Sequence, residues 1–393
     1  MNSPIAALNA LNFFLADVRD GLGPFLGIFL QGQGWSPGEI GLVMTIGGLA
    51  GVAAATPLGL VVDRSRRLRL LLGLAAIAII LSCGANFAMP VLGAVAPAQI
   101  VSGIAAAVVA PAMAGLTLGL VGQGGYPHQL GRNEAWNHAG NATAAVLSGA
   151  LGWMFGLPAV FVLMAAMAGG SLFALLSIPA GAIDHAAASG AAERGDASAV
   201  RVRDLLAHRP LRVLAGSMML FHLANAAMLP LLGQAMVARG TAGDASAYTA
   251  ATVLVAQGTM IPMALLAAWL AEQRGYWIVF VLALAALPLR GALAGLIPHP
   301  AVLIPVQMLD GVGAGLLGVA MPGLIARLLN GTGRVNTGLA LVMTGQGIGA
   351  ACSPLLAGMV AEWWGYGAAF LALGLIAAGA LGLWLAAGDR SPS

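Results

Sequence analysis

The sequence predicts an all-α polytopic membrane protein with twelve transmembrane helices in two pseudo-symmetric six-helix bundles. Of the 393 residues 60% are hydrophobic and only 8% are charged, too little charge to cover the surface of a soluble protein of this size. Residues 70–131 and 135–183 contain no Asp, Glu, Lys or Arg. Each of these gaps is long enough for two membrane helices of about 20 residues and a turn. An internal repeat, described below, supplies the pseudo-symmetry.

Charges, Pro/Gly turns and Trp-bearing helix ends divide the chain into the individual spans. The widest polar interruption, 181–210, is rich in small residues, Arg and Asp. We therefore expect an N-terminal bundle at 1–180, a linker at 181–210 and a C-terminal bundle at 211–393. The expected spans are 7–31, 38–62, 68–88, 97–121, 133–155, 157–180, 211–236, 246–271, 276–297, 301–328, 335–361 and 364–387.

The distribution of arginines predicts the orientation. Arginines cluster in the even-numbered loops and the C-terminal tail, whereas the odd-numbered loops contain only Arg239. Cytoplasmic loops of membrane proteins carry the excess of positive charge. Both termini and the linker are therefore expected in the cytoplasm, with the chain in the cytoplasmic (inner) membrane of a bacterium.

The two halves resemble each other at a shift of 208 residues. Gln99-Ile-Val-Ser-Gly103 maps onto Gln307-Met-Leu-Asp-Gly311, and Leu15-Ala16-Asp17 maps onto Leu223-Ala224-Asn225. Agreement of separate segments on one shift favours a true repeat over coincidence among abundant small residues. Parallel six-helix repeats are typical of transporters whose site lies between the halves near the middle of the bilayer.

The loop after the second expected span carries a family motif. Gly59-Leu-Val-Val-Asp63-Arg64-Ser-Arg66-Arg67-Leu68 resembles the signature loop of the major facilitator superfamily, G-x-x-x-D-R-x-G-R-R. It has Arg66 in place of the second Gly and Leu68 in place of the last Arg. The resemblance covers essentially the whole chain and implies that fold, with a gating role for Gly59, Asp63, Arg64 and Arg67. The alternative for the arginines is a cluster that only fixes orientation.

Two antiporter patterns of that family are altered here. The fourth-helix pattern lacks its arginine at Gln99–Gly103, and the fifth-helix pattern lacks its proline at 140–149. A closer match lies in the eleventh span, at Gly349-Ala-Ala-Cys-Ser353-Pro354-Leu-Leu-Ala357-Gly358. The sequence therefore neither favours nor excludes drug/proton antiport.

Three charges interrupt the first apolar run at Asp17, Arg19 and Asp20. A charge at the bilayer centre costs at least about 2.5–3.5 kcal/mol, and in the resembled family the first helix lines the cavity. We expect Arg19 to pair with Asp20 or Glu134, leaving Asp17 nearest the cavity as the coupling carboxylate. The alternative is an ion-pair network that only fixes helix packing.

The fifth span begins with a polar stripe. Glu134, Asn137, His138 and Asn141 follow an i, i+3, i+4, i+7 spacing, which places them on one helix face. Glu134 and His138, one turn apart, have the chemistry to share a proton. The alternative is that Glu134 only stabilises the first turn of its helix.

Fewer polar residues mark the C-terminal half. His222 and Asn225 lie one turn apart in the seventh span, before Pro230, which is expected to break that helix. We expect Arg290 of the ninth span to have Asp310 of the tenth as its counter-ion. His222 suits either a packing role or a contact with substrate.

These features predict a secondary active transporter that moves a small polar solute by alternating access with proton coupling. Drug or divalent-metal efflux by the same fold is the alternative, and a membrane receptor or enzyme is less favoured because no catalytic motif occurs. The expected partners are the substrate, protons and the lipid bilayer. We expect a monomer with no cofactor, no resident metal and no nucleic acid partner.

The orientation is testable at the linker. A Ser189→Cys variant should react with a membrane-impermeant thiol reagent in inside-out vesicles but not in intact cells, because residues 181–210 are expected in the cytoplasm. Labelling of the introduced thiol in intact cells would reverse the orientation.

Overall fold

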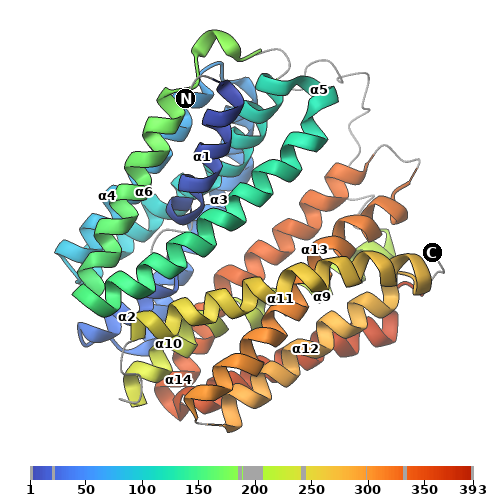
Figure 1. The fold of residues 1–393 in the computed structure, drawn as a ribbon. Helices are drawn as coiled ribbons and strands as arrows, with labels where there is room; N and C mark the ends of the chain where they lie inside the picture. The colour runs from blue at the N-terminus through green and yellow to red at the C-terminus, as the bar shows by residue number, and fades with distance from the viewer. Residues whose placement is uncertain are drawn as a thin grey trace. The chain divides into compact units, whose positions relative to one another are not determined.

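The computed structural model describes residues 3–19, 23–184, 188, 207–239, 245–297, 299–330 and 334–390, and long helices make up most of them (Figure 1). Short 3₁₀ turns at Ala180–Ala182 and Pro300–Val302 complete the elements. The helices are α1 (Pro4–Arg19), α2 (Pro24–Gly32), α3 (Pro37–Arg64), α4 (Leu68–Ala88), α5 (Leu92–Phe155), α6 (Leu157–Leu176), α9 (Arg209–Asn225), α10 (Met228–Arg239), α11 (Ala245–Arg274), α12 (Tyr276–Leu296), α13 (Leu303–Leu328) and α14 (Val335–Ala387).

These helices provide the twelve expected spans. The first span consists of α1 and α2, and the seventh of α9 and α10. Two spans in succession lie within α5 and two within α14, separated by Gly122 (φ 65°) and Gly365 (φ 84°). Glycine is the residue that adopts this left-handed conformation without strain, so each pair is joined by a sharp turn rather than a long loop. The predicted twelve-helix fold is confirmed.

The expected start of the fifth span at residue 133 is wrong. The helix resumes directly after Gly122 and continues to Phe155. Glu134 therefore lies about three turns inside the helix, and it cannot be a first-turn acid. The sequence misleads at this point because residues 123–132 are polar enough to resemble a loop.

The first span is discontinuous, unlike the single helix expected over 7–31. The first helix ends at Arg19, the second begins at Pro24, and Gly23 between them has a φ of 46°. Proline has no N–H to continue a helical ladder, which explains the break before α2. Asp20 lies outside the described residues, as does the side chain of Arg19, so their expected pairing stays a prediction.

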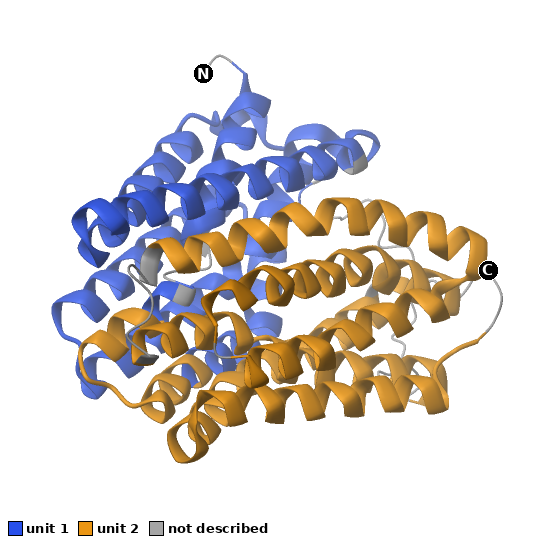
Figure 2. Ribbon diagram, turned by 60° about the horizontal axis from the view of Figure 1, so that its bottom comes forward, with its two compact units in different colours: residues 1–26, 46–196 blue, residues 27–45, 197–393 orange. Residues whose placement is uncertain are grey.

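The chain divides into two compact units (Figure 2). Unit 1 is residues 1–26 and 46–196, where α1 packs on α5 and α6, and α4 packs on α5. Unit 2 is residues 27–45 and 197–393, where α14 packs on α9 and α12, and α11 packs on α13. The bundle boundaries expected from the sequence stay a prediction, and most of the expected linker lies outside the described residues.

The repeat is visible in the closest helix crossings. A Cβ added to Gly103 of α5 would overlap the carbonyl oxygen of Gly47 in α3. The corresponding Cβ on Gly311 of α13 would lie 2.5 Å from the carbonyl oxygen of Ala256 in α11. Small residues allow such backbone contact between membrane helices. The same crossing therefore occurs once in each unit, with a shift of 208 residues between the glycines and 209 between the residues they approach.

A second pair of crossings is similar but not in register with the repeat, since the two glycines are 209 residues apart and the residues they approach are 206 apart. A Cβ on Gly140 of α5 would overlap the carbonyl oxygen of Phe13 in α1. A Cβ on Gly349 of α14 would overlap the carbonyl oxygen of Met219 in α9. The expected pseudo-symmetry is thus built on equivalent small residues, which is why the repeat is detectable among abundant Gly and Ala.

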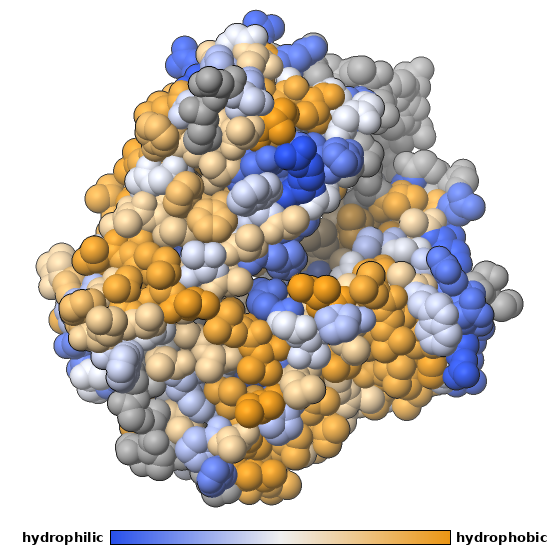
Figure 3. Space-filling view, viewed as in Figure 1, coloured by the Kyte–Doolittle hydropathy of each residue, from blue (hydrophilic) through white to orange (hydrophobic). Residues whose placement is uncertain are grey.

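Apolar residues cover much of the face shown in Figure 3. Leu81 and Phe173 of unit 1 are 68% and 66% exposed, and Leu265 and Leu375 of unit 2 are 71% and 75% exposed. Nine helical segments among the described residues are long and apolar enough to cross a membrane. Extensive exposed apolar surface marks contact with lipid or a partner, and lipid is the occupant that suits helices of this length.

The glycine crossing in unit 1 has a matched control. Gly103→Ala should destabilise the protein by about 1–3 kcal/mol, because the new methyl group overlaps the backbone of α3. Gly84→Ala should be neutral or slightly stabilising, because a Cβ there meets no described atom within 4 Å and alanine favours helix. Thermal unfolding in detergent measures both. Equal melting temperatures would contradict the close crossing.

Candidate functional site

A polar pocket lies within unit 1 between α1 and the two halves of α5. Its volume is about 120 Å³, enough for several water molecules. Its apolar wall includes Leu15, Val109 and Met113. The polar lining residues are Asn12, Thr117, Asn133, Glu134 and Asn137.

A chain of hydrogen bonds fixes one side of this pocket. Gln129 Nε2 donates to Asn9 Oδ1 and to Asn133 Oδ1, each over 2.9 Å. Asn133 Nδ2 donates to Thr117 Oγ1 over 2.8 Å, and that hydroxyl donates to the Met113 carbonyl oxygen over 2.8 Å. Because Asn9, Gln129 and Asn133 are buried, these mutual bonds replace lost hydration. They connect α1 to both halves of α5 and hold Asn133 in one orientation.

Glu134 is the acidic residue of the pocket lining. Its side chain is exposed rather than enclosed. In the described part of the chain its carboxylate makes no hydrogen bond or ion pair, and this includes the expected pairing with His138. A carboxylate in an apolar bundle is stabilised by a proton, a cation or a hydrogen-bond donor. Glu134 is therefore available to bind any of these.

The structure brings together some of the predicted polar residues of unit 1. Glu134 and Asn137 both line the pocket, and Asn141 Nδ2 donates to Asn137 Oδ1 over 3.4 Å. His138 is exposed and is not among the lining residues. Asp17 is half-buried near the end of α1 and likewise does not line the pocket. The four-residue stripe is therefore divided between the pocket and its surroundings.

Sequence reasoning missed Asn12, Thr117 and Asn133. A signal was present, since Gln129, Asn133 and Asn137 recur every four residues and so share one helix face. The early start of the second half of α5 hides this pattern, because residues 123–132 resemble a loop.

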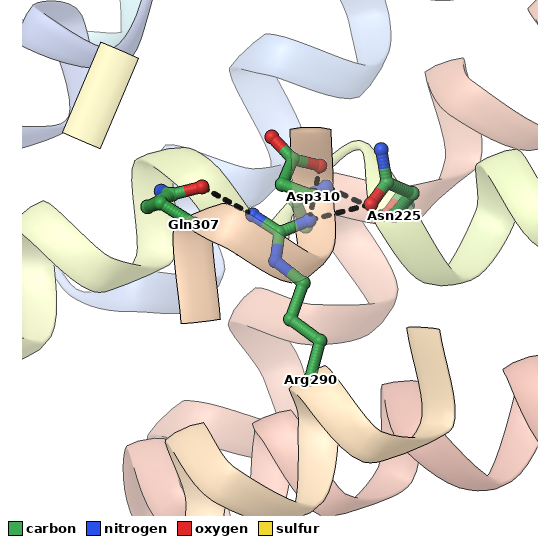
Figure 4. A network of polar contacts seen from close by, with 6 residues as sticks. Asn225, Arg290, Gln307 and Asp310 are labelled. Carbon is green, nitrogen blue, oxygen red and sulfur yellow. Dashed lines mark hydrogen bonds and ion pairs between the residues drawn. The ribbon is translucent and has the colours of Figure 1, made fainter. Parts of the chain in front are cut away.

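A second polar cluster surrounds Arg290 in unit 2 (Figure 4). Arg290 of α12 is fully buried. Its Nη1 donates to Asn225 Oδ1 of α9 over 2.5 Å and to Asp310 Oδ1 of α13 over 2.7 Å. Its Nη2 donates to Gln307 Oε1 over 3.2 Å. Three helices are thus joined through one guanidinium, and the expected Arg290–Asp310 pair is confirmed.

Some donors in this network lack a hydrogen-bond acceptor, and one of its side chains is partly exposed to solvent. Arg290 Nε and Gln307 Nε2 are buried donors without a hydrogen-bond partner among the described residues. The side chain of Asp310 remains 18% exposed, against 1% for Arg290. A buried charge without its partner is strongly destabilising, so Asp310 has a structural task whatever else it binds.

The break between α9 and α10 lies beside this network. The first of these helices ends at Asn225 and the second begins at Met228. Pro230 has no N–H for the Ala226 carbonyl group, and Ser353 Oγ accepts the Ala227 N–H over 3.0 Å. The predicted helix break is confirmed, with Ser353 of α14 stabilising it.

His222 lies one turn before Asn225 and is half-buried. Its Nδ1 is 2.9 Å from the Met218 carbonyl oxygen, so Nδ1 carries the proton and donates. This tautomer leaves Nε2 as an acceptor. The packing role and the substrate role that the sequence left open are therefore compatible.

The predicted gating motif lies at the end of α3 and the start of α4. Asp63, Arg64 and Arg67 are exposed, and a Cβ at Gly59 would meet no described atom within 4 Å. No described helix therefore approaches Gly59 closely in this structure. A gating role for the four residues stays a prediction.

A family model described as Major Facilitator Superfamily matches residues 5–302. The chain belongs to the major facilitator superfamily. Its relatives include proteins named "Uncharacterized MFS-type transporter" from Mycobacterium tuberculosis strains CDC 1551 / Oshkosh and ATCC 25618 / H37Rv. Each is 41% identical over 388 residues, covering 97% of this chain and 92% of the relative. This major facilitator protein is therefore a multi-pass membrane transporter.

Solved structures show the same fold for this major facilitator protein. A mutant form of the nucleoside transporter NupG matches with a TM-score of 0.83 and 14% identity, covering 98% of this chain and all of that one (100%). A D-xylose-proton symporter matches with a TM-score of 0.71 and 13% identity, covering 98% and 97%. At these identities the likeness concerns the fold.

The Arg290 network is testable by paired substitutions. Arg290→Ala should cost about 3–5 kcal/mol of stability, because Asp310 loses its counter-ion in a largely buried site. Arg290→Met combined with Asp310→Asn removes both charges and should recover much of that loss. Unfolding measurements in detergent compare the two variants. A double variant as unstable as Arg290→Ala would contradict the charge-pair explanation.

Proposed function

We propose that this transporter moves a small polar solute by alternating access and couples that movement to protons. The carrying observation is Glu134, a carboxylate without a partner among the described residues, in a pocket lined by amides and a hydroxyl. Ionisable residues within transmembrane segments are expensive, and they commonly mark substrate and proton pathways. Glu134 is accordingly the proposed proton-binding group.

The pocket chemistry supports an organic solute. Asn12, Asn133 and Asn137 present amides that both donate and accept hydrogen bonds. A divalent cation needs acceptors only, whereas an organic solute with hydroxyl or amine groups uses both kinds of partner. The negative charge of Glu134 would repel an anionic solute in this pocket. We therefore propose a neutral or cationic solute, held by the amides of the pocket.

In unit 2 we propose that the Arg290 network is chiefly structural. It fixes Asn225 beside the break in the seventh span, where His222 offers its free Nε2. Asp310 holds the buried guanidinium in place. His222 and Asn225 are then the proposed solute contacts of this unit, and Gly59, Asp63, Arg64 and Arg67 the proposed gating residues.

The proposed setting is the cytoplasmic membrane of a bacterium, with both termini in the cytoplasm. The pocket then lies in the cytoplasmic half of its helices, because Asn12 is near the start of the first span and Thr117 near the end of the fourth. The solved neighbours are named as a nucleoside transporter and a D-xylose-proton symporter, and we propose a solute of the same broad kind, small and polar, carried by a monomer.

The coupling role of Glu134 is testable in proteoliposomes. A thermal-shift screen of metabolites first identifies a solute that stabilises the wild type but not Asn137→Ala. Glu134→Gln should then lose accumulation driven by a proton gradient while still exchanging solute without a gradient, because glutamine keeps the shape but cannot release a proton. Glu272→Gln, an exposed acid at the end of α11, is the control and should behave as the wild type.

Asp17→Asn separates the two candidate carboxylates. If Asp17→Asn abolishes gradient-driven accumulation and Glu134→Gln does not, the coupling role belongs to Asp17, as the sequence first indicated. If both variants accumulate solute normally when a proton gradient is applied, the proposal that this half of the protein couples transport to protons is wrong.

A further inference from the structure

The hairpin formed by residues 27–45 packs against α14 within unit 2. A Cβ on Gly41 would overlap the Pro354 carbonyl oxygen, and a Cβ on Gly358 would overlap the Pro37 carbonyl oxygen. The backbones are therefore in direct contact at two points. Only small residues allow this approach.

The eleventh-span motif noted in the sequence lies at this contact. Pro354 interrupts the hydrogen-bond ladder of α14, because it lacks an N–H and its ring crowds the preceding turn. The next N–H, that of Leu355, donates to Thr45 Oγ1 of α3 over 3.1 Å. The Ser-Pro pair and Gly358 thus form the surface of α14 on which the first turns of α3 pack.

The start of α3 has a capping box. Glu39 Oε2 accepts the Ser36 N–H over 2.9 Å, and Ser36 Oγ accepts the Glu39 N–H over 3.2 Å. This reciprocal arrangement satisfies two N–H groups at the helix terminus. It also leaves the Ser36 hydroxyl proton free to be donated elsewhere.

That proton is donated to a carboxylate on α14. Glu362 Oε2 accepts the Ser36 hydroxyl over 2.9 Å and the Gly38 N–H over 3.0 Å. Helix N-termini favour negative charge, and hydrogen bonds to an ionised acceptor are about twice as strong as neutral ones. Nearby, Gln31 Nε2 donates to the Tyr366 hydroxyl over 2.8 Å. Glu362 is therefore the charged link between the hairpin and α14.

We propose that Glu362 is a proton-sensitive latch that holds the 27–45 hairpin on α14 when ionised and releases it when protonated. The contact lies within unit 2, and the rest of α3 lies in unit 1. In the alternating access proposed above, release of Glu362 would free the first turns of α3 from α14. The latch joins the loop after the first span to the loop after the eleventh. Odd-numbered loops face the outside of the cell in the expected orientation, so acid outside favours release. This inference rests on the proposed alternating access and orientation, but not on the proton role of Glu134 or on the solute.

The other titratable groups on the packed elements set the controls. Among the described residues of the hairpin and α14 they are Glu39, which bonds within the first turn of α3, Tyr366, which accepts from Gln31, and Cys352, which is replaced in the labelled protein. Protonation of Glu362 removes the negative charge from the helix terminus. Protonation of Glu39 would weaken only the capping box. A pH response from Glu362 is therefore separable from one due to Glu39.

Spin-label distances test the latch in the full-length protein. Labels are placed at Gln33→Cys and Trp363→Cys, both at exposed positions, after Cys83 and Cys352 are replaced by alanine. At pH 7.5 the short distance should dominate, and at pH 4.5, where carboxylates begin to be protonated, the longer distance should gain. In Glu362→Gln the ratio of long to short distances should already be raised about tenfold at pH 7.5. With Glu134→Gln and Asp17→Asn present in every labelled protein, so that neither candidate coupling carboxylate responds to pH, this ratio should no longer change with pH.

Glycine substitutions provide an independent test. A Cβ on Gly38 would overlap Glu362 Oε2, whereas a Cβ on Gly32 meets nothing within 4 Å. Gly38→Ala should therefore displace the carboxylate and reproduce the Glu362→Gln distances, and Gly32→Ala should match the wild type. Glu39→Gln should keep the pH response. Retention of the response in Glu362→Gln, its loss in Glu39→Gln, or a wild-type distribution in Gly38→Ala would each overturn the latch.

Discussion

The absence of water in the bilayer core is the constraint that shapes this structure. Every buried polar group must find its partner inside the protein. The backbone does so by forming helices, and the side chains do so through short chains such as Asn9–Gln129–Asn133–Thr117. Buried polar atoms without a partner among the described residues, such as Arg290 Nε and Gln307 Nε2, depart from this rule and cost stability.

Two features of the fold followed directly from composition and periodicity. Apolar segments separated by charges indicated the twelve spans, and the repeat survived because small residues at helix crossings are held by backbone contact, as at Gly103 and Gly311. Turns made by a single residue could not be predicted in this way. Gly122 reverses the chain without a loop, so the polar residues after it resemble a loop although they begin a helix.

The candidate site was harder to predict because it depends on which helices meet. Glu134 and Asn137 were found from their spacing alone, but Asn12 and Thr117 join them only through the packing of α1 on both halves of α5. His138 shared the predicted face and still lies outside the lining. The spacing of polar residues shows which face of a helix is polar. The packing of the neighbouring helices decides which residues of that face line a pocket.

The two halves share a backbone plan but differ in where they carry polar groups. Shifted by the repeat, Arg290 corresponds to Ser82, whose hydroxyl merely donates to the Ala78 carbonyl group of its own helix. Unit 1 instead has its polar cluster on the first, fourth and fifth spans. The halves are therefore specialised in their polar residues, while the crossings that define the fold are kept in both.

The third helix belongs to both units, since residues 37–45 lie in unit 2 and residues 46–64 in unit 1. Its first turns are seated on α14 through Gly38 and Gly41, and its next turns on α5 through Gly47 and Gly51. Close glycine contacts thus hold one continuous helix in both units. In the alternating access proposed for this transporter, α3 can move with one unit only by bending between these two sets of contacts or by losing one of them.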